Sequence, residues 1–427
     1  MRAAFFVSLT MGIASCWAVG CGTVDANRDG ASRPGRVVIL VPPSERPAWQ
    51  EIARAFAATT HGVDVEIVEG PQSTDLRENL YTASLLARDP SFDLIYLDVT
   101  WTPKFAGAGW LLPLDDRVAP EELDSFLPAA LDAGRFRGRL YRLPVRTDCG
   151  LLYWRRDLLD EAGRPPPETF EDLRATARAL QSPPDRWGFV WQGKQYEGLV
   201  CDYLEVLRGH GGFWIDPETG SVGLDRPEAI EALQFLRDCV ADDPISPAGV
   251  TTYQEEESRR IFQDGRAVFL RNWPYAWRLA QADDSPLKGR IGAGPMVRTE
   301  KGRRTATLGG WGFGISAFSR HPDEALAFVR FVTSLEGQRL LCRDTGYAPA
   351  RIEAYRDSAL LDANPFLATI ARVHRDAVAR PTFPGYALAS DILQRQLSSA
   401  LTGSVSPETA LRRAAAQTRP LTRGTAR

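Results

Sequence analysis

Histidine is scarce in this sequence, and the common catalytic motifs are missing from it. The four histidines show no ligand spacing between any two of them: His61, His210, His321 and His374. A histidine metal site or a Ser/His/Asp triad is therefore not indicated. The chain has no Walker loop, no G-x-S-x-G elbow and no H-E-x-x-H motif, and Gly107-x-Gly109 lacks the third glycine of a dinucleotide loop. We accordingly expect no catalytic residues, no cofactor and no metal.

An excess of positive charge is missing as well. Lys and Arg number 51 against 54 Asp and Glu, for a net charge of -3, and no basic stripe runs along the chain. Nucleic acid is therefore not an expected partner. The composition, with 44% hydrophobic and 25% charged residues, is globular, and 427 residues are too many for one ordinary core. We expect two lobes or more.

A hydrophobic run long enough to cross a bilayer is missing from the N-terminus. Met1-Arg2 precedes an apolar run at residues 3–14, which has the layout of a secretory signal. Ala18-Val19-Gly20-Cys21 resembles a lipobox, so we predict a signal peptide at residues 1–21 with lipidation at Cys21. Cys16 is the second candidate, and a cleaved signal with incidental cysteines is the alternative. Residues 22–35 would form a flexible polar tether between a lipid anchor and the folded body.

Metal-binding or redox spacing is also absent from the cysteines that follow the signal. Four remain if Cys21 is lipidated and Cys16 is removed: Cys149, Cys201, Cys239 and Cys342. Their spacings match no zinc or redox motif. An oxidising compartment would permit a disulfide between Cys201 and Cys239, and buried free thiols are the alternative.

Short apolar segments alternate with helical patterns from Arg36 onward, which is typical of a parallel sheet covered by helices on both faces. We predict strands or extended runs at residues 37–41, 63–68, 93–98, 139–144, 151–154 and 267–271. We predict helices at residues 48–59, 74–88, 169–180, 197–209, 227–241, 253–264, 322–333, 335–344, 365–374, 386–402 and 407–417.

The segment at residues 93–98, Asp-Leu-Ile-Tyr-Leu-Asp, predicts a buried parallel strand that ends on Asp98, with Trp101 close behind it. Ligands of open α/β sheets bind beyond the carboxyl ends of the strands. A carboxylate can accept from two hydroxyls, an arginine can donate to sugar oxygens, and an aromatic ring can cover the apolar face of a sugar. This residue set favours a carbohydrate site.

Several longer stretches, in this order, carry a resemblance to a known family. They are LDVTWTPKFAGAGWLLPLDD, LPVRTDCGLLYWRRDLLDEAG, GFVWQGKQYEGLV, FLRNWPYAW, GGWGFGIS, GYAPAR and ARPTFPGY. The chain resembles the family 1 solute-binding proteins of ABC importers, and within them the maltose/trehalose-binding branch. The likeness runs from about Arg36 to the C-terminus, and the lipobox agrees with it.

The resemblance implies an α/β fold of the type II periplasmic-binding-protein kind, in which two lobes, each a sheet flanked by helices, close on ligand by hinge motion. Crossing segments would lie near residues 144–149, 308–313 and 364–380. Lobe I would comprise residues 36–146 plus 312–363, and lobe II residues 147–311 plus 364–427.

The same resemblance assigns ligand-binding positions. Asp98 and Asp148 would bind sugar hydroxyls, while Trp273 and Trp311 would be stacking plates; the proline after Trp273 and the glycines around Trp311 favour loops. The structural alternatives are capping at strand ends for the carboxylates and core packing for the aromatics. The resemblance also assigns cleft positions to Glu45, Arg77 and Arg380, for which a solvated charge or a local ion pair is the alternative. The last assigned positions are Trp101, Glu257, Tyr275, Gly310 and Arg351, of which Tyr275 and Glu257 could equally pack against and cap their own helices.

The function implied is that of a monomeric, lipid-anchored receptor facing the periplasm or cell exterior. It would bind an α-linked disaccharide or short oligosaccharide of the trehalose or maltose type and deliver it to the permease subunits of an ABC transporter. No covalent chemistry would be involved.

Two positions depart from the family pattern. Val145-Arg146 stands where Trp-Tyr is common, and Cys149 stands where a small alanine is usual. An arginine in the cleft makes a phosphorylated or acidic glycan conceivable. A secreted glycoside hydrolase using Asp98 and Asp148 is an alternative, although nearby arginines should keep both carboxylates ionised. A sugar sensor that docks on a membrane receptor is another.

Overall fold

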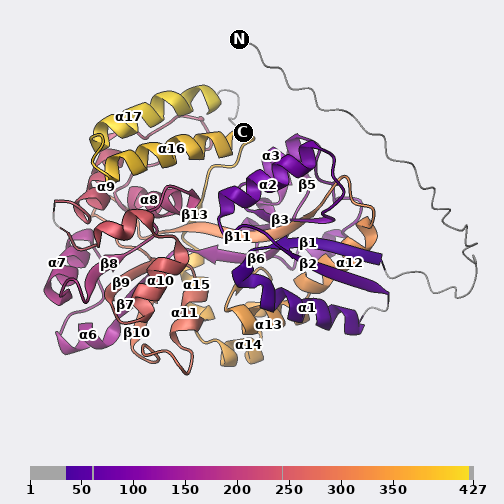
Figure 1. The fold of residues 1–427 in the computed structure, drawn as a ribbon, viewed down its shortest axis with the longest axis horizontal. Helices are drawn as coiled ribbons and strands as arrows, with labels where there is room; N and C mark the ends of the chain where they lie inside the picture. The colour runs from indigo at the N-terminus through magenta and orange to yellow at the C-terminus, as the bar shows by residue number, and fades with distance from the viewer. Residues whose placement is uncertain (1–34, 60–61, 243, 423–427) are drawn as a thin grey trace, which may run out of the picture. The chain divides into compact units, whose positions relative to one another are not determined.

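Two β-sheets organise residues 35–59, 62–242 and 244–422, which are the part of the chain that the computed structural model describes (Figure 1). The predicted signal peptide, both candidate lipidation sites, Cys21 and Cys16, and nearly all of the tether lie outside these residues. Within them, no helix combines the length and the apolar character needed to cross a bilayer.

The first sheet has seven strands, in the order β12-β6-β11-β3-β1-β2, with β13 paired to β11 outside this order. Their bounds are β1 Gly35–Val41, β2 Val63–Glu69, β3 Leu94–Asp98, β6 Leu143–Cys149, β11 Ala306–Ile315, β12 Ala348–Pro349 and β13 Ala377–Ala379. β1, β2 and β3 are parallel, as the sequence predicts. The prediction of a parallel sheet is right for these strands only, because β11 lies antiparallel to both β3 and β6.

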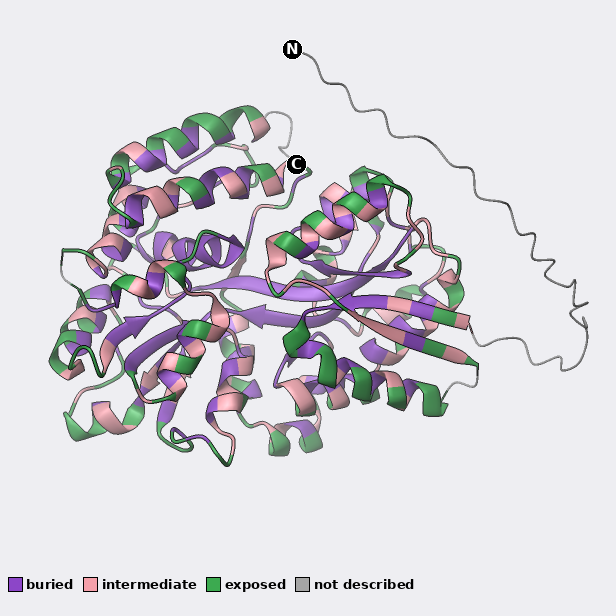
Figure 2. Cartoon of the chain, in the orientation of Figure 1, coloured by how far each residue is buried: buried purple, intermediate pink, exposed green. Residues whose placement is uncertain are grey.

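The central strands of the first sheet, β3, β6 and β11, are buried on both faces, which explains why β3 carries an unbroken apolar run. Trp49 of α1 (Arg46–Thr59) packs edge-on against Tyr96 of β3, with ring centroids 5.4 Å apart. Tyr81 of α2 (Thr74–Leu86) donates from its hydroxyl to the backbone oxygen of Leu40 in β1 over 3.0 Å. Figure 2 shows buried residues along these strands and exposed residues on the outer sides of the helices.

The second sheet has four strands in the order β10-β7-β9-β8. Their bounds are β7 Leu151–Arg155, β8 Trp187–Val190, β9 Ala267–Asn272 and β10 Ile291–Gly294, and a separate hairpin consists of β4 Arg135–Phe136 and β5 Arg139–Leu140. β6 of the first sheet and β7 of the second are separated only by Gly150. The chain thus passes between the sheets there, just after the predicted first crossing. The described residues belong to one compact unit, so the exact lobe boundaries stay predictions.

The remaining elements are helices that cover these sheets. Before β9 they are α3 Thr102–Gly107, α4 Pro120–Leu123, α5 Pro128–Asp132, α6 Arg156–Glu161, α7 Phe170–Leu180, α8 Glu197–Gly209, α9 Pro227–Asp238 and α10 Glu255–Gln263. After β9 they are α11 Tyr275–Ala280, α12 Pro322–Thr333, α13 Leu335–Thr345, α14 Ser358–Ala363, α15 Leu367–His374, α16 Tyr386–Leu401 and α17 Pro407–Thr418. Short 3-10 helices occupy Pro43–Glu45, Ala248–Thr252, Glu353–Arg356 and Arg419–Thr422.

Most helices with strong local signals begin where the sequence predicts. Thr169 caps α7 through a capping box with Asp172, and α8 and α12 match their predicted bounds. The short α11 was not predicted, because Tyr275 follows a proline and the whole helix has only six residues. The prediction of a loop around Trp311 is wrong: the residue lies inside β11, whose glycines permit close strand pairing with β6.

The cysteines of the described residues form no disulfide. Cys149, Cys201, Cys239 and Cys342 are all buried free thiols, so the suggested Cys201–Cys239 bond is absent. The two residues instead pack into the interior from α8 and from the end of α9.

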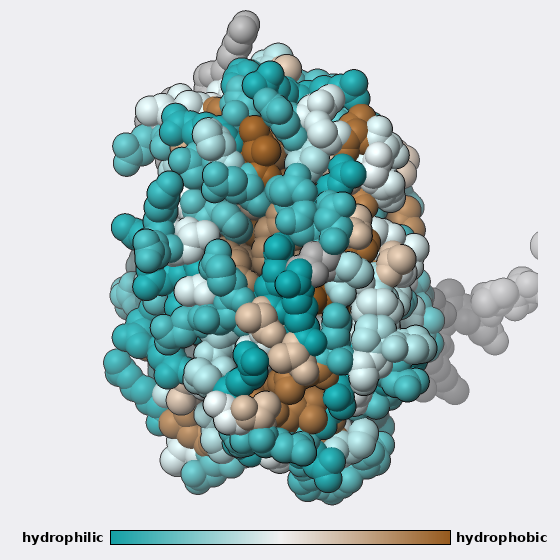
Figure 3. All heavy atoms as spheres, turned by 90° about the vertical axis from the view of Figure 1, so that its left-hand side faces the viewer, coloured by the Kyte–Doolittle hydropathy of each residue, from teal (hydrophilic) through white to brown (hydrophobic). Residues whose placement is uncertain are grey.

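Hydrophilic side chains cover most of the face shown in Figure 3, which is formed by the elements at the left of Figure 1. Apolar areas on this face are small and separate from one another. This surface composition is that of a protein face in contact with water.

Candidate functional site

A cavity of about 400 Å³ opens between elements of the first sheet and elements of the second. We call it the cleft. Nine of the twelve ligand-binding residues predicted from the sequence line it: Glu45, Arg77, Asp98, Asp148, Trp273, Tyr275, Gly310, Trp311 and Arg380. They come from the 3-10 helix after β1, from α2 and α11, from the interior of β11, and from the ends of β3, β6, β9 and β13. Residues far apart in the chain thus converge on one site.

The other three predicted residues lie elsewhere. Trp101 is 3% exposed and packs edge-to-face against Trp311, with ring centroids 5.4 Å apart. Glu257 caps α10, where its carboxylate accepts from the backbone N–H of Gln254 over 2.9 Å. Arg351 donates to the backbone oxygen of Thr333 over 3.2 Å and lies over the ring of Phe126. Their surroundings fit the structural alternatives given above.

Arg380 joins the two sides of the cleft. Its Nη2 donates to both carboxylate oxygens of Asp98, at 2.8 and 3.0 Å, and its Nη1 donates to Glu197 Oε1 over 2.6 Å. Asp98 ends β3 of the first sheet, whereas Glu197 begins α8 beside the second sheet. All three groups are buried, so each charge depends on the others for compensation.

Arg146 is the centre of a second buried charge cluster. Its Nη2 lies 3.0 Å from Glu45 Oε1 and its Nη1 lies 3.4 Å from Asp148 Oδ2. The guanidinium also stacks on Tyr347, at 3.6 Å from the ring centroid, and Glu45 accepts a second hydrogen bond from Trp49 Nε1 over 3.1 Å. The arginine that departs from the family pattern is therefore neutralised by carboxylates of the cleft itself.

Asp148 keeps one oxygen without a partner. Its Oδ1 is buried and accepts no hydrogen bond, although the residue lines the cleft. Burial raises the pKa of Asp148 to about 6, against the lowering effect of Arg146. The prediction that a neighbouring arginine would keep this carboxylate ionised is therefore only partly right, because burial outweighs the arginine. At pH 7 most of the population still carries the charge and can accept from a donor in the cleft.

The two predicted stacking residues differ in their surroundings. Trp273 follows β9 in a loop and is partly exposed, with the guanidinium of the buried Arg271 4.3 Å from its ring centroid. Trp311 is 8% exposed and has the Arg77 guanidinium 4.5 Å from its ring centroid. Trp273 thus presents more free surface to the cleft than Trp311 does.

Two adjacent glycines allow this arrangement. A Cβ on Gly309 would lie 3.0 Å from Cζ3 of Trp273, so the tryptophan ring packs directly on the backbone of β11. Gly310 has a φ of +136°, a conformation that other residues rarely adopt, and its missing side chain leaves space for the backbone of Arg146. The predicted role of Gly310 in ligand binding is not tested by these contacts, which show its structural role.

The sequence reasoning missed several cleft residues although their segments were recognised. Tyr347 lies in the stretch GYAPAR and Glu197 in GFVWQGKQYEGLV, and both line the cleft. In α10, Glu256 and Arg259 face the cleft, whereas the predicted Glu257 does not. The helical repeat of 3.6 residues could have indicated this, because positions 256 and 259 lie on the same face of the helix and position 257 does not.

Asp75, in the first turn of α2, makes a further contact between the elements of the two sheets. Its carboxylate accepts from the backbone N–H of Glu197 and from the side chain of Gln394. Burial raises the pKa of Asp75 to about 7, with contributions from the charges of Glu197 and Glu78. Lys104 bonds Glu78 over 3.0 Å but does not contact Asp75.

The raised pKa of Asp75 predicts a pH dependence of stability. In the unfolded state the carboxyl has its ordinary pKa of 3.8, so it releases its proton at a lower pH than in the folded state. Stability is therefore lost as the pH rises from about 4 to about 7. We expect Asp75→Asn to be more stable than the unaltered protein at pH 8, by about 1 kcal/mol, and the difference to fall by more than half at pH 5. Urea unfolding at both pH values measures it. Asp64→Asn on the exposed edge of β2 is the control and should follow the unaltered protein at each pH.

In the part of the chain that the structure describes, no group of His, Cys, Asp and Glu is arranged to hold a metal ion. The cleft offers carboxylates, guanidinium groups and aromatic rings, which together form hydrogen bonds and cover an apolar ring face.

Comparison with known proteins was made by sequence and by structure. Residues 42–339 match the family described as bacterial extracellular solute-binding protein. A probable ABC transporter-binding protein of Deinococcus radiodurans is 36% identical over 369 residues, covering 84% of this chain and 87% of that protein. The maltotriose-binding protein of Pyrococcus abyssi is 28% identical over 356 residues, covering 82% of this chain and 74% of that protein.

The fold matches solved structures of the same kind. Maltose-bound T. maritima MalE3 superimposes with a TM-score of 0.86 and 38% sequence identity, covering 91% of this chain and 99% of that structure. The predicted α/β periplasmic-binding-protein fold is thereby confirmed.

Proposed function

Because the chain belongs to the family of bacterial extracellular solute-binding proteins, we propose that it binds an α-linked disaccharide or short oligosaccharide in the cleft and delivers it to an ABC importer. The family consists of binding proteins and not of enzymes, so the hydrolase alternative finds no support. Relatives named for maltose and maltotriose support the choice of sugar.

The observation that carries this proposal is the free oxygen of Asp148. A buried carboxylate oxygen without a partner is unfavourable unless a donor reaches it, and a sugar hydroxyl entering the cleft is such a donor. The partly exposed ring of Trp273 lies on the same cavity and would cover the apolar face of the sugar ring. These two groups provide the hydrogen bonding and the stacking that a pyranose requires.

The charges of the cleft favour a neutral sugar over a phosphorylated or acidic one. Seven carboxylates and five arginines line the cavity, and Arg146 and Arg380 already bind carboxylates on its walls. An anionic ligand would have to compete with these carboxylates for the arginines. The acidic glycan suggested by Arg146 in the sequence is therefore the weaker alternative.

The lobe assignment of residues 36–146 plus 312–363 and 147–311 plus 364–427 belongs to this proposal. The ion pairs of Arg380 with Asp98 and Glu197, and the Asp75 contacts, would form when the lobes close and break when they open. Lipidation at Cys21 would hold the protein at the membrane surface, beside its permease. The proposal includes trehalose as well as maltose as a ligand, and titration with both sugars tests this part of it.

Calorimetry of residues 25–427 with maltose, maltotriose, trehalose, sucrose and glucose 1-phosphate tests the proposal. We expect saturable binding of at least one α-glucoside and weaker binding of the phosphate. Asp148→Asn and Asp98→Asn should each weaken the binding by about 2 kcal/mol, or roughly thirtyfold, because each loses a charge-assisted hydrogen bond to a hydroxyl.

Asp323→Asn provides the matched control, since Asp323 is 86% exposed and pairs only with Arg117 at the surface. Its affinity should equal that of the unaltered protein. If both cleft variants retained full affinity, the site assignment would be wrong, and if none of the sugars bound, the sugar class would be wrong.

A further inference from the structure

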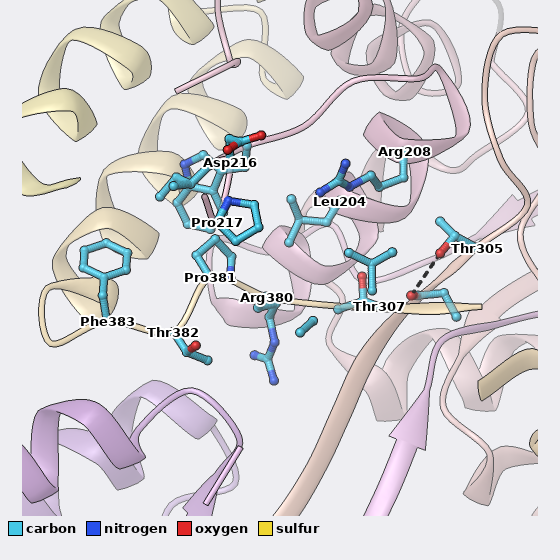
Figure 4. Close-up of a pocket in the computed structure, with 15 residues that line it drawn as sticks. Leu204, Arg208, Asp216, Pro217, Thr305, Thr307, Arg380, Pro381, Thr382 and Phe383 are labelled. Atoms are coloured by element: carbon cyan, nitrogen blue, oxygen red, sulfur yellow. Dashed lines mark hydrogen bonds between the residues drawn. The ribbon is translucent and has the colours of Figure 1, made fainter. Parts of the chain in front are cut away.

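A second cavity, of about 330 Å³, lies outside the cleft. We call it the rear pocket. It is enclosed by the C-terminal half of α8, by the loop after α8, by the start of β11 and by the segment from β13 to Phe383 (Figure 4). Its volume falls at the lower end of the range of small-molecule sites, of about 300 to 1,000 Å³.

The wall of the rear pocket is mainly apolar. It is formed by Leu204, Ile215, Pro217, Val378, Pro381 and Phe383. Figure 4 shows Leu204 and Arg208 on one side of the pocket and Phe383 on the other. A ligand that fits here therefore needs an apolar body of modest size.

Two polar groups of the pocket are donors without an acceptor among the described residues. Trp214 is 2% exposed, and its indole Nε1 has no hydrogen-bond acceptor. The half-buried Arg208 guanidinium forms no hydrogen bond or ion pair with any described residue. Burial lowers its pKa, and the negative charge of Asp216 at the rim opposes this lowering. An indole N–H buried without an acceptor is unfavourable, and a nearby guanidinium adds a positive charge.

Three of the acceptors and hydroxyls around the pocket are already engaged. Thr307 Oγ1 donates to the backbone oxygen of Cys201 over 3.0 Å, and Thr305 Oγ1 donates to that of Asp376 over 2.7 Å. At the rim, Asp216 Oδ1 accepts from the backbone N–H groups of Glu218 and Thr219. The pocket thus offers a ligand two donors, Trp214 Nε1 and Arg208, with the Asp216 carboxylate at its rim.

We propose that the rear pocket is a second binding site, for a small organic acid whose carboxylate accepts from Trp214 Nε1 and Arg208 and whose apolar body fills the space between Leu204 and Phe383. A carboxylate brings acceptors only and suits these two donors, whereas a neutral polyol also brings hydroxyl donors that neither of them can accept. This site does not depend on the sugar proposed for the cleft.

The rear pocket is linked to the cleft through shared structure. Arg380 lines both cavities. Figure 4 shows its side chain pointing away from Pro381 and Pro217. At its far end, the guanidinium binds Asp98 and Glu197 of the cleft. β11 and β13, which form one wall of the pocket, also pair with each other beside the cleft. A ligand that rests on this wall should therefore alter sugar affinity, and the sugar should alter its affinity by the same factor.

Titration with sodium benzoate and sodium hexanoate, followed by calorimetry and by the chemical shift of the tryptophan indole protons, tests the site. We expect saturable benzoate binding, with one indole proton shifting downfield, and at least tenfold weaker binding of benzyl alcohol, which lacks the charge. Arg208→Gln and Trp214→Phe should each weaken benzoate binding about tenfold while the protein stays folded. Trp214→Phe should also remove the shifting indole signal.

Asp148→Asn separates this site from the cleft, because it alters the cleft alone and should leave benzoate binding unchanged. Arg395→Gln, at an exposed ion pair on α16, controls for the loss of a surface charge. Absence of saturable benzoate and hexanoate binding, equal binding of benzyl alcohol, or unchanged binding in both pocket variants would each overturn the proposal. Loss of benzoate binding in Asp148→Asn would place the acid in the cleft and would overturn it as well.

Discussion

Replacing Arg380 with methionine is expected to lower the free energy of unfolding by about 3 to 5 kcal/mol, because it leaves two buried carboxylates without their shared cation. The Arg380 side chain is 2% exposed, and it provides hydrogen bonds to both oxygens of Asp98 and to Glu197. Asp98 retains the N–H and hydroxyl of Thr100, and Glu197 retains the hydroxyls of Tyr386 and Ser390, but none of these carries a charge.

Urea unfolding at pH 7 measures this effect. Arg412→Met is the matched control, since Arg412 is 68% exposed and pairs with Glu408 one turn away on α17; its change should stay below about 1 kcal/mol. Adding Asp98→Asn to Arg380→Met should recover part of the loss, because one uncompensated charge is removed. A double variant no more stable than Arg380→Met would show that lost packing, and not stranded charge, explains the loss.

Gly310→Ala is expected to destabilise the protein by about 3 kcal/mol or more, through backbone strain and a steric clash. Gly310 has a φ of +136°, and a Cβ there would lie 2.7 Å from the backbone oxygen of Arg146 and 3.1 Å from Cα of Thr147. Both contacts are with the backbone of β6, which cannot rotate away as a side chain could. β6 and β11 would have to separate, and this would displace Asp148 and Trp311 from their present positions in the cleft.

The matched control is Gly107→Ala at the end of α3, where a Cβ would meet only ring carbons of Phe136 at 3.5 Å, an ordinary contact. Its stability should change by less than about 1 kcal/mol, since alanine is the better helix former. Differential scanning calorimetry of both variants, together with sugar titration, measures stability and binding. A Gly310→Ala protein as stable as the control would mean that the two strands adapt without strain.

Local patterns predicted the helices and strands well where the residues themselves carry the signal. The apolar run before Asp98 specified a buried strand, and the proline at the start of α12 and the capping box of α7 marked where these helices begin. The same patterns did not reveal that β11 runs antiparallel to β3, because strand direction depends on how the chain returns from the second sheet.

The family resemblance, together with residue types at strand ends, was enough to propose most of the cleft. Asp98, Asp148 and Trp273 each stand at or just after the end of a strand, where open α/β sheets place their ligands. Glu257 and Arg351 carry the same chemistry, but Glu257 faces the cap of its own helix and Arg351 faces the end of α12. Side-chain direction within an element, and not residue type, separates the two groups.

The sequence by itself determined the class of fold, the alternation of strands and helices, and a residue set suited to a sugar. The tertiary structure decided which charges meet: that Arg146 binds Glu45 and Asp148, that Arg380 joins Asp98 to Glu197, and that Trp214 is left without an acceptor. Local structure depends on neighbours within a few residues. These pairings join residues up to 282 positions apart, and only the packing of the two sheets brings them together.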